Sequence, residues 1–222
     1  HILGTDDVGR DVVSRLIYAS RVSLSVGFAV SLLAVVLGSI AGAIGGYYGG
    51  RTDSLVSGGI NVLLSIPLIP MAMVLGAFLT TNLLFVVLIL GLLSWTGVAR
   101  VIRAEFLSLK EREFVMAARL IGVSDLRIIS RHILPNVMAV VIVAATLMVA
   151  TAILAESALS YLGYGIQPPT ASWGNMLQNA QRFFRINPML AIYPGILISL
   201  TVICINFVGD GMRDALDPRL RN

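Results

Sequence analysis

The chain carries four long runs in which no residue is charged. These runs lie between Arg21 and Arg51, between Asp53 and Arg100, between Arg131 and Glu156, and between Arg185 and Asp210. A helix that crosses the hydrocarbon core of a bilayer needs about 20 consecutive apolar residues. The second run is roughly twice that length, and Thr80-Thr81-Asn82 offers a polar turn in its middle. The runs therefore predict five spanning helices, at 22–46, 56–79, 83–99, 136–157 and 190–209.

The composition favours a membrane protein over a soluble one. Hydrophobic residues make up 57% of the chain and charged residues 13%, against about 25% charged residues in an ordinary soluble domain. A buried helical core in a soluble protein is the alternative, but uncharged runs of this length are hard to hide in a chain of 222 residues. We expect an all-α, polytopic membrane helix bundle that forms a single domain over 1–222. The formal net charge of +4 does not indicate nucleic-acid binding, because the basic residues lie in the gaps between apolar runs.

Basic residues are concentrated on one side of the predicted bundle. The segments 47–55, 100–135 and 210–222 share that side, and their basic residues are Arg51, Arg100, Arg103, Lys110, Arg112, Arg119, Arg127, Arg131, Arg213, Arg219 and Arg221. The other side holds only Arg10, Arg15, Arg21, Arg182 and Arg185. The positive-inside rule places the first side in the cytoplasm. We therefore expect an extracytoplasmic lead-in at 1–21, a cytoplasmic loop at 100–135, an extracytoplasmic loop at 158–189 and a cytoplasmic tail at 210–222. The lead-in shows no signal-peptide pattern, so we expect a sixth spanning helix upstream of it.

Glycines recur every four residues along the first predicted span, at Gly38, Gly42, Gly46 and Gly50. At helical spacing they fall near one face, where small residues allow another helix backbone to approach closely. Packing within the same subunit is the favoured interpretation, and a subunit interface or a pore-lining face is the alternative.

Two prolines, Pro67 and Pro70, lie in the second predicted span. Each lacks a backbone donor, so we expect a kink or local unwinding there. Broken helices can line translocation paths, although many are only bends.

The sequence shows no catalytic, metal-binding or ATP-binding pattern. The lysine of a phosphate-binding loop follows Gly-x-x-x-x-Gly, whereas the single lysine of this chain, Lys110, follows Leu109 and precedes Glu111. His132 has no second metal ligand at a useful spacing, which favours a helix-end or packing role. Glu156 lies at the end of a predicted span, which favours an interfacial role over the ion coupling that intramembrane acids serve.

The cytoplasmic loop 100–135 has an amphipathic, mostly helical pattern. Its apolar face is supplied by Ala117, Ala118, Leu120, Ile121, Ile128 and Ile129. Gly122 predicts the end of one helix, Ser124-Asp125 the capped start of the next, and Pro135 the first turn of a spanning helix. A short helix with Ala117 and Ala118 at its surface can fit a groove on a soluble partner. It can equally lie on the lipid surface, and composition alone leaves both interpretations open.

The spacing Ala117-Ala118-x-x-x-Gly122, followed by Leu134-Pro135, resembles the EAA loop of importer-type ABC-transporter permeases. In that family the loop forms a coupling helix that docks into the ATP-hydrolysing subunit. The resemblance implies docking contacts at Met116, Ala117, Ala118, Arg119, Gly122, Arg127, Leu134 and Pro135. Two positions depart from the family pattern, because Met116 replaces the usual Glu and His132 replaces the usual Ile. These departures concern a particular polar contact rather than the docking itself.

Three further segments narrow the resemblance. They run from His1 to Leu16, from Tyr161 to Leu177 and from Asn206 to Arg219. Each resembles the corresponding segment of the second permease in the dipeptide, oligopeptide and nickel importer group. Together with the loop they cover the chain in order. Members of that group typically have six spans, and the additional one precedes the segment that begins at His1, which agrees with the helix expected upstream.

The resemblance implies a membrane-spanning permease subunit of an ATP-driven ABC importer, which forms half of the translocation pathway for peptides or a related small solute. The implied partners are a second homologous permease, two ABC ATPase subunits, an extracytoplasmic solute-binding protein and the lipid bilayer, with no nucleic acid. The implied location is a bacterial or archaeal cell (inner) membrane. ATP and Mg²⁺ belong to the ATPase subunits, so we expect this chain to hold no cofactor and to be no enzyme.

Two other function classes are the alternatives. One is a secondary carrier or channel that works without ATPases, and the other is a structural or assembly membrane protein. The loop pattern argues against both. Within the importer class, peptides, nickel chelates, glutathione and other small solutes all stay open as substrates.

The extracytoplasmic loop 158–189 is polar and aromatic, with a turn at Gln167-Pro168-Pro169. We expect Trp173, Phe183 and Phe184 to be interfacial anchors. The segment either contacts a solute-binding protein or rests as a cap on the membrane surface, and we expect Ser172 to be accessible for a crosslink that separates the two.

Overall fold

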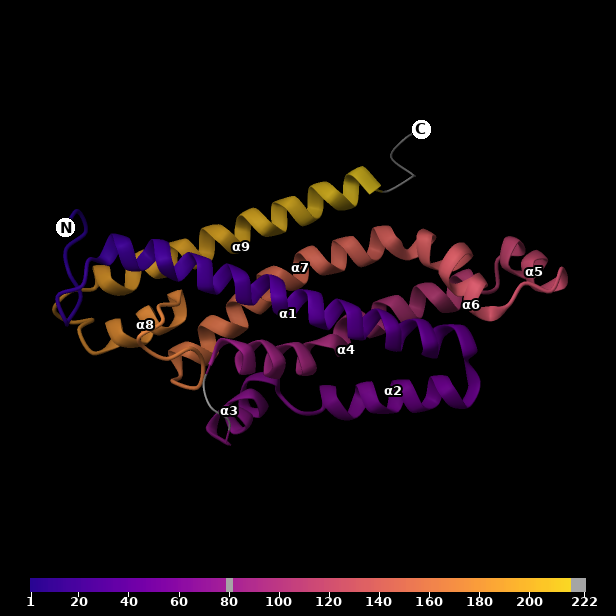
Figure 1. Ribbon diagram of the computed structural model, residues 1–222, viewed down its shortest axis with the longest axis horizontal. Helices are drawn as coiled ribbons and strands as arrows, with labels where there is room; N and C mark the ends of the chain where they lie inside the picture. The colour runs from indigo at the N-terminus through magenta and orange to yellow at the C-terminus, as the bar shows by residue number, and fades with distance from the viewer. Residues whose placement is uncertain (79–81, 217–222) are drawn as a thin grey trace.

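The computed structural model describes residues 1–78 and 82–216, and its long helices run nearly side by side (Figure 1). In chain order they are α1 (Val12–Tyr48), α2 (Gly50–Leu64), α3 (Leu68–Phe78), α4 (Leu83–Leu109), α5 (Glu113–Leu120), α6 (Asp125–Arg127), the π-helix η1 (Ile128–Ile133), α7 (Leu134–Tyr161), α8 (Trp173–Gln181) and α9 (Met189–Leu216). Within the described residues the only extended pairing is an isolated bridge between Thr5 and Asp11. The predicted all-α class is confirmed.

In the described part of the chain, four helices are long and apolar enough to cross a membrane. They are α1, α4, α9 and the continuous helix Asp125–Tyr161, which joins α6, η1 and α7. Helices α2 and α3 are bent by 80° at a short break and together can form a fifth span. These spans agree with the five predicted. The break ends at Pro67, which confirms the predicted unwinding, because Pro67 has no N–H to continue the ladder of α2. Pro70, by contrast, lies inside α3.

Helix α1 begins at Val12, ahead of the predicted start at 22. The Asp11 carboxylate caps it by accepting the Ser14 backbone N–H at 2.8 Å. The end of the predicted lead-in 1–21 is therefore helical. An uncharged run marks only the part of a helix that suits the hydrocarbon core of the bilayer. The helix itself continues past Arg21 to its capping residue, Asp11.

Helix α4 also extends beyond its predicted limits. It continues to Leu109, so the start of the predicted loop 100–135 belongs to a spanning helix. At its other end, the Asn82 side chain accepts the Phe85 backbone N–H at 3.0 Å and caps the helix. The predicted turn residues Thr80 and Thr81 lie outside the described residues.

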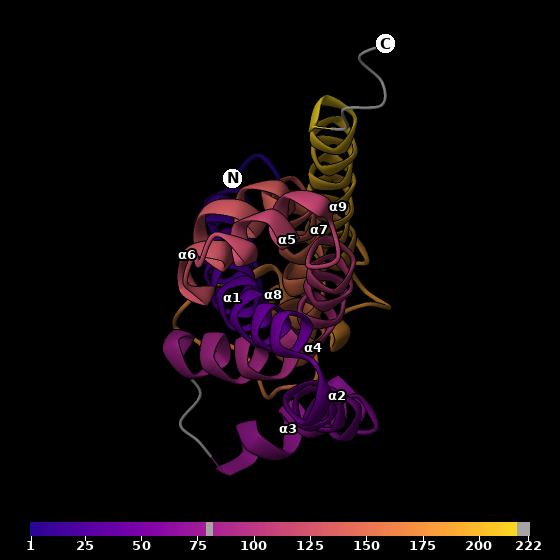
Figure 2. The ribbon, with the colours of Figure 1, turned by 90° about the vertical axis from the view of Figure 1, so that its right-hand side faces the viewer.

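The connections fall at two opposite ends of the bundle. In Figure 1 the N-terminus, α3 and α8 lie at one end, while α5, α6 and the link between α1 and α2 lie at the other. This arrangement agrees with the two sides that the charge distribution predicts. Figure 2 views the molecule from the α5 and α6 end, with α9 at one edge of the bundle and α2 and α3 at the opposite edge.

Three glycines bring α1 against α4. A Cβ atom added to Gly38 would lie 2.7 Å from Val98 Cβ, and one added to Gly42 would lie 2.6 Å from the Ala99 carbonyl oxygen. At Gly46 the nearest atom would be Phe106 Cβ, at 2.6 Å. These positions therefore serve packing within the chain, as the favoured interpretation predicts.

Gly50 does not share the glycine face, because α1 ends at Tyr48 and Gly50 begins α2. An added Cβ there would meet nothing within 4 Å.

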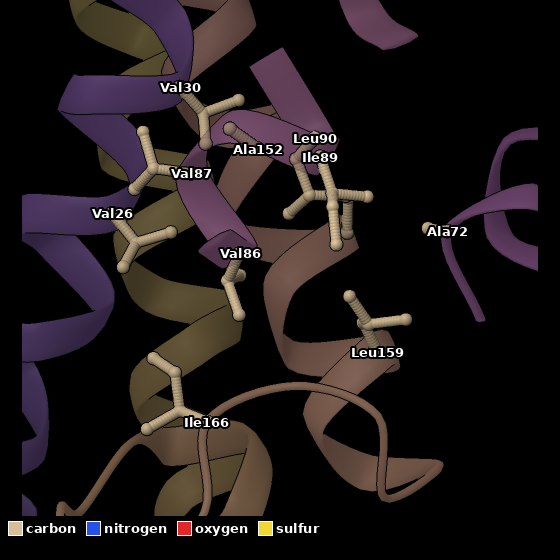
Figure 3. Packing of buried hydrophobic residues seen from close by; sticks show 11 residues of the cluster. Val26, Val30, Ala72, Val86, Val87, Ile89, Leu90, Ala152, Leu159 and Ile166 are labelled. Atoms are coloured by element: carbon tan, nitrogen blue, oxygen red, sulfur yellow. The ribbon is translucent and has the colours of Figure 1, made fainter. Parts of the chain in front are cut away.

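The half of the bundle toward α8 is closed by an apolar cluster that joins α1, α3, α4 and α7 (Figure 3). Its members include Val26, Val30, Ala72, Val86, Val87, Ile89, Leu90, Ala152, Leu159 and Ile166. A second cluster fills the half toward α5 and holds residues of α1, α4, α5, η1 and α7. These two clusters hold α1, α4 and α7 together and support the connections at either end, while α9 packs on the bundle through a third cluster that includes Val149, Ile153 and Ile198.

Candidate functional site

The short helix α5 rests on the end of the bundle with one face inward. Val115 and Ala118 are three residues apart and both are buried, in the same cluster as Phe106 of α4 and Ile128 of η1. Glu113 lies in the first turn of α5 and Arg119 in the last, which suits the helix dipole. The loop is therefore a packed element and not a free tether.

Gly122 ends α5 in a Schellman motif. Its own N–H donates to the Arg119 carbonyl at 3.0 Å, and the Val123 N–H donates to the Ala118 carbonyl at 3.1 Å. The φ angle of Gly122 is +80°, in the left-handed region that glycine adopts without a steric penalty. The predicted helix end is confirmed, and Gly122 has a structural task whether or not it touches a partner.

The chain returns to the bundle through a helix that changes its pitch. It starts at α6 after Ser124, as predicted, although the Ser124 side chain makes no capping hydrogen bond. It then passes through the π-helix η1 and becomes α7 at Leu134. Pro135 lies in the first turn of α7, so it cannot donate to the carbonyl four residues earlier. The wider π turn accommodates that missing hydrogen bond. The predicted start of a spanning helix at Pro135 is thus correct, although the helical path begins earlier.

The outward side of this loop is apolar. We call the four side chains Met116, Leu120, Ile121 and Leu126 the loop tip, of which Leu120 is 89% exposed, Ile121 80% and Leu126 77%. Leu120 and Ile121 belong to the apolar face predicted from the sequence and are exposed, whereas Ala118 and Ile128 of the same predicted face are buried. A group of large exposed apolar side chains beside arginines is typical of an interaction surface.

The predicted docking residues divide into two groups. Met116, Ala117, Arg119, Gly122, Arg127 and Pro135 are exposed, and Leu134 is half-buried. Ala118 is only 5% exposed, so its predicted place at the surface beside Ala117 is wrong. The reason is the helical period: Ala118 follows Val115 by three residues and so lies on the same face of α5, which packs into the bundle.

Tyr47, at the end of α1, lies beneath the loop and contacts both of its helices. Its hydroxyl donates to Asp125 Oδ1 at 2.6 Å. The Arg119 guanidinium lies 5.2 Å from the centroid of its ring, a cation–π arrangement. Sequence reasoning misses this residue, because a tyrosine at the end of an apolar run gives no sign of a partner 78 residues away.

A bidentate ion pair fastens α2 to α4 near the same end. Asp53 Oδ2 accepts from Arg103 Nη2 at 2.6 Å, and Asp53 Oδ1 accepts from Arg103 Nε. Arg103 also belongs to the stretch of α4 against which Gly42 and Gly46 pack. The ends of α1, α2 and α4 are thus tied into one unit.

At the other end of the bundle, α8 is tucked between the long helices. Ser172 and Asn175 form a capping box, in which the Asn175 N–H donates to Ser172 Oγ at 3.2 Å and the Ser172 N–H donates to Asn175 Oδ1 at 3.1 Å. Trp173 is buried and its Nε1 donates to the Leu16 carbonyl at 3.3 Å. The predicted anchor role of Trp173 and the predicted accessibility of Ser172 are therefore wrong, whereas Phe184 is exposed.

Glu156 is fully buried where α1, α7 and α8 meet. Its carboxyl group accepts from Ser160 Oγ at 2.7 Å and from Ser23 Oγ at 3.2 Å, and Ser23 Oγ in turn accepts the Trp173 N–H at 3.1 Å. The interfacial role predicted for Glu156 is wrong, because α8 folds over it. Hydrogen bonds from hydroxyl groups satisfy the buried carboxyl.

In the lead-in, Asp6 joins two arginines. It accepts the Arg10 backbone N–H and the Arg10 Nε–H, each at 2.8 Å, and lies 3.2 Å from Arg15 Nη1. Burial raises the pKa of Asp6, but the hydrogen bonds from Arg10 and Val8 outweigh it and hold the pKa below its ordinary value. This ion cluster holds the lead-in against the start of α1.

The chain matches one known protein family over most of its length. Residues 34–222 match the family described as the binding-protein-dependent transport system inner membrane component. The chain belongs to this family. It is therefore a transport subunit and not an enzyme, and the family supports the permease interpretation over a carrier or channel that works without partners.

Relatives match the permease along its whole length. It is 44% identical over 221 residues to the oligopeptide transport system permease protein OppC of Escherichia coli K12, a match that covers 100% of this chain and 73% of that protein. It is 41% identical over 222 residues to the dipeptide transport system permease protein DppC of Alkalihalophilus pseudofirmus, with the same coverage.

Solved structures share the fold. The permease superposes on a chain of the inward-facing MetNI methionine ABC transporter with a TM-score of 0.77 and 19% identity, covering 92% of this chain and 97% of the other. It superposes on a chain of an amino acid ABC transporter with a TM-score of 0.70 and 14% identity, covering 92% and 95%. These likenesses establish the transmembrane fold of ABC importers.

Proposed function

We propose that this permease is the membrane-spanning subunit of an ATP-driven importer of peptides and forms half of the translocation pathway. The proposal is supported by full-length similarity to one permease named for oligopeptides and another named for dipeptides. We further propose a second homologous permease as the partner that completes the pathway, and the inner membrane of a bacterial or archaeal cell as the location.

The loop tip is the proposed docking surface for a separate ATPase subunit, which holds ATP and Mg²⁺. The observation that carries this proposal is the exposure of Leu120 and Ile121 on a helix whose other face is packed into the bundle. A helix built this way buries its exposed apolar side chains in a partner's groove and passes the partner's movement to the spanning helices. Ala117, Gly122 and Arg127 lie on the same exposed loop, and Ala118 supports it from beneath.

In this mechanism the ATPase subunits move the permease through its docked loop. Closure of two ATPases draws the two docked loops together, and the spans then change between inward-facing and outward-facing arrangements. The extracytoplasmic segment around α8 is the proposed contact for a solute-binding protein. The exposed side chains Phe184 and Ile186 are the available apolar contacts there.

Uptake by the reconstituted complex tests the proposed function. The permease, its partner permease, the ATPases and the binding protein are placed in liposomes, and isotope-labelled dialanine and trialanine are offered with ATP and Mg²⁺. Uptake that depends on ATP and on the binding protein is expected. ATP hydrolysis without entry of either peptide would contradict peptides as the substrate.

Cysteine crosslinking tests the docking surface in the same complex. Leu120→Cys is expected to crosslink to the ATPase subunit, because Leu120 is 89% exposed at the loop tip. Ala118→Cys is the matched control, since Ala118 lies on the same helix but faces the bundle. A crosslink from position 118 with none from position 120 would place the docking surface elsewhere.

A further inference from the structure

We propose that Tyr47 is a positioning residue that carries the movement of the loop into α1. This inference rests on the proposed function, because it concerns how a docked ATPase moves the spanning helices. It starts from the position of Tyr47, which is 4% exposed and is the penultimate residue of α1, beneath both α5 and α6.

Tyr47 engages the two helices of the loop through different atoms. The hydroxyl donates to Asp125 in α6 at 2.6 Å, and the ring face receives the guanidinium of Arg119 from α5. One side chain therefore fixes α5 and α6 relative to each other as well as to α1. Neither contact is possible for an aliphatic residue at position 47.

One end of the loop continues directly into α7, because α6, η1 and α7 form one helix. The contacts of the loop with the other long helices are of another kind. Val115 and Ala118 of α5 reach the bundle through apolar packing, which is not directional and permits sliding. Within the described residues, the bond from Tyr47 to Asp125 is the only side-chain hydrogen bond that joins the segment 113–127 to α1, α2, α4 or α9. A directional contact at this point converts a shift of the loop into a shift of α1 rather than a slip across it.

Next to Tyr47, α1 is packed tightly against α4, and α4 is in turn joined to α2. The preceding residue, Gly46, lies so close to α4 that an added Cβ would be 2.6 Å from Phe106 Cβ and 2.7 Å from the Arg103 carbonyl. Arg103 is in turn paired with Asp53 of α2. A displacement that enters at Tyr47 therefore reaches α1, α4 and α2 together.

Two single-site variants remove the polar contact and keep the apolar packing. Tyr47→Phe retains the ring and its contact with Arg119, and Asp125→Ala changes an exposed side chain. Tyr48→Phe is the matched control, because Tyr48 is the neighbouring tyrosine, is 56% exposed, and its hydroxyl makes no hydrogen bond within the described part of the chain. Asp125→Asn keeps an acceptor oxygen for the Tyr47 hydroxyl.

The measurement is the number of labelled peptides imported per ATP hydrolysed by the reconstituted importer. Because a hydrogen bond to a carboxylate shifts an equilibrium by roughly tenfold or more, we expect the ratio to fall about tenfold in Tyr47→Phe and in Asp125→Ala. ATP hydrolysis is expected to persist in both. The double variant should be no worse than either single one. Tyr48→Phe should stay near the wild type, and Asp125→Asn, which keeps a neutral acceptor, should lose less than Asp125→Ala.

The outcomes separate this inference from the proposed function. An unchanged ratio in both Tyr47→Phe and Asp125→Ala would overturn the role of Tyr47. Equal losses of transport and hydrolysis, with less ATPase co-purified, would also overturn it, because they indicate a purely structural role. A wild-type complex that hydrolyses ATP but imports neither dialanine nor trialanine would instead contradict the proposed substrate and leave the loop to be tested by crosslinking.

Discussion

Ser23 uses its hydroxyl group twice at a junction of three helices. The hydroxyl donates to Glu156 of α7 and accepts the Trp173 N–H of α8. Its removal leaves the buried N–H of Trp173 without this acceptor and takes one donor from the buried carboxyl of Glu156. Leaving a buried polar group unsatisfied costs about 1–3 kcal/mol.

We therefore expect Ser23→Ala to lower the free energy of unfolding by about 1–3 kcal/mol. The midpoint of thermal unfolding, followed by tryptophan fluorescence in detergent, measures the effect. Ser25→Ala is the control, because Ser25 is exposed and its hydroxyl bonds only to the Val22 carbonyl of its own helix. Equal midpoints for the two variants would show that the junction does not depend on this hydroxyl.

Gly122 supports a prediction about the end of α5. Gly122→Ala meets no atom within 4 Å, so the expected cost is that of the left-handed backbone alone, about 1–2 kcal/mol. We expect faster trypsin cleavage after Arg119 and slower peptide transport, with membrane insertion unchanged. Gly97→Ala, in α4 and with equally open surroundings, should show neither effect. A Gly122→Ala protein as resistant to trypsin as the wild type would contradict the role of the Schellman motif.

At the scale of elements, the pairing of α1 with α4 is the tightest constraint in the bundle. At Gly42 an added Cβ would lie 2.6 Å from the Ala99 carbonyl oxygen and 2.9 Å from the Arg103 nitrogen. Both atoms belong to the backbone and cannot rotate away as a side chain can. Small residues thus bring together the two helices that carry the loop and its support.

We expect Gly42→Ala to force α1 and α4 apart and to lower the stability by about 1–3 kcal/mol, as overpacking does elsewhere. Its thermal midpoint in detergent should fall, and its peptide transport should fall with it. Gly59→Ala in α2, where nothing lies within 4 Å, should be neutral or slightly stabilising because alanine favours helix. The prediction fails if the two variants unfold at the same temperature.

At the scale of the whole molecule, the described chain leaves long apolar faces open. Helix α9 lies at one edge of the bundle (Figure 2), and Ile196, Leu200, Ile203 and Phe207 on it are exposed. The loop tip is exposed at the α5 end of the bundle as well. Lipid covers such faces within the bilayer, and the proposed subunits cover the rest.

We accordingly expect the permease to unfold at a higher temperature in the assembled importer than alone in detergent. A partner that binds only the folded state adds stability of about 2.7 kcal/mol when present at roughly a hundred times its dissociation constant. The thermal midpoint of the purified chain, compared with that of the complex, provides the measurement. Identical midpoints would contradict assembly through the exposed surfaces.

Several parts of the fold and the site could be predicted because they depend on local chemistry. Uncharged runs reveal the spans, Pro67 the break in the second span, and Gly122 the end of α5. The burial of Ala118, Trp173 and Glu156 could not be predicted, because each depends on which element folds over it. The contact between Tyr47 and Asp125 was missed for the same reason.

By itself, the sequence determined the all-helical class, the spans, the two sides of the bundle and the resemblance to a permease. These follow from hydropathy, charge and short motifs, which act over a few residues and need no partner. Only the tertiary structure decided which face of α5 is open, that the glycine stripe packs against α4, and that Tyr47 connects the loop to α1. Such contacts join residues far apart in the chain, and a buried or exposed face is defined only once the helices have packed.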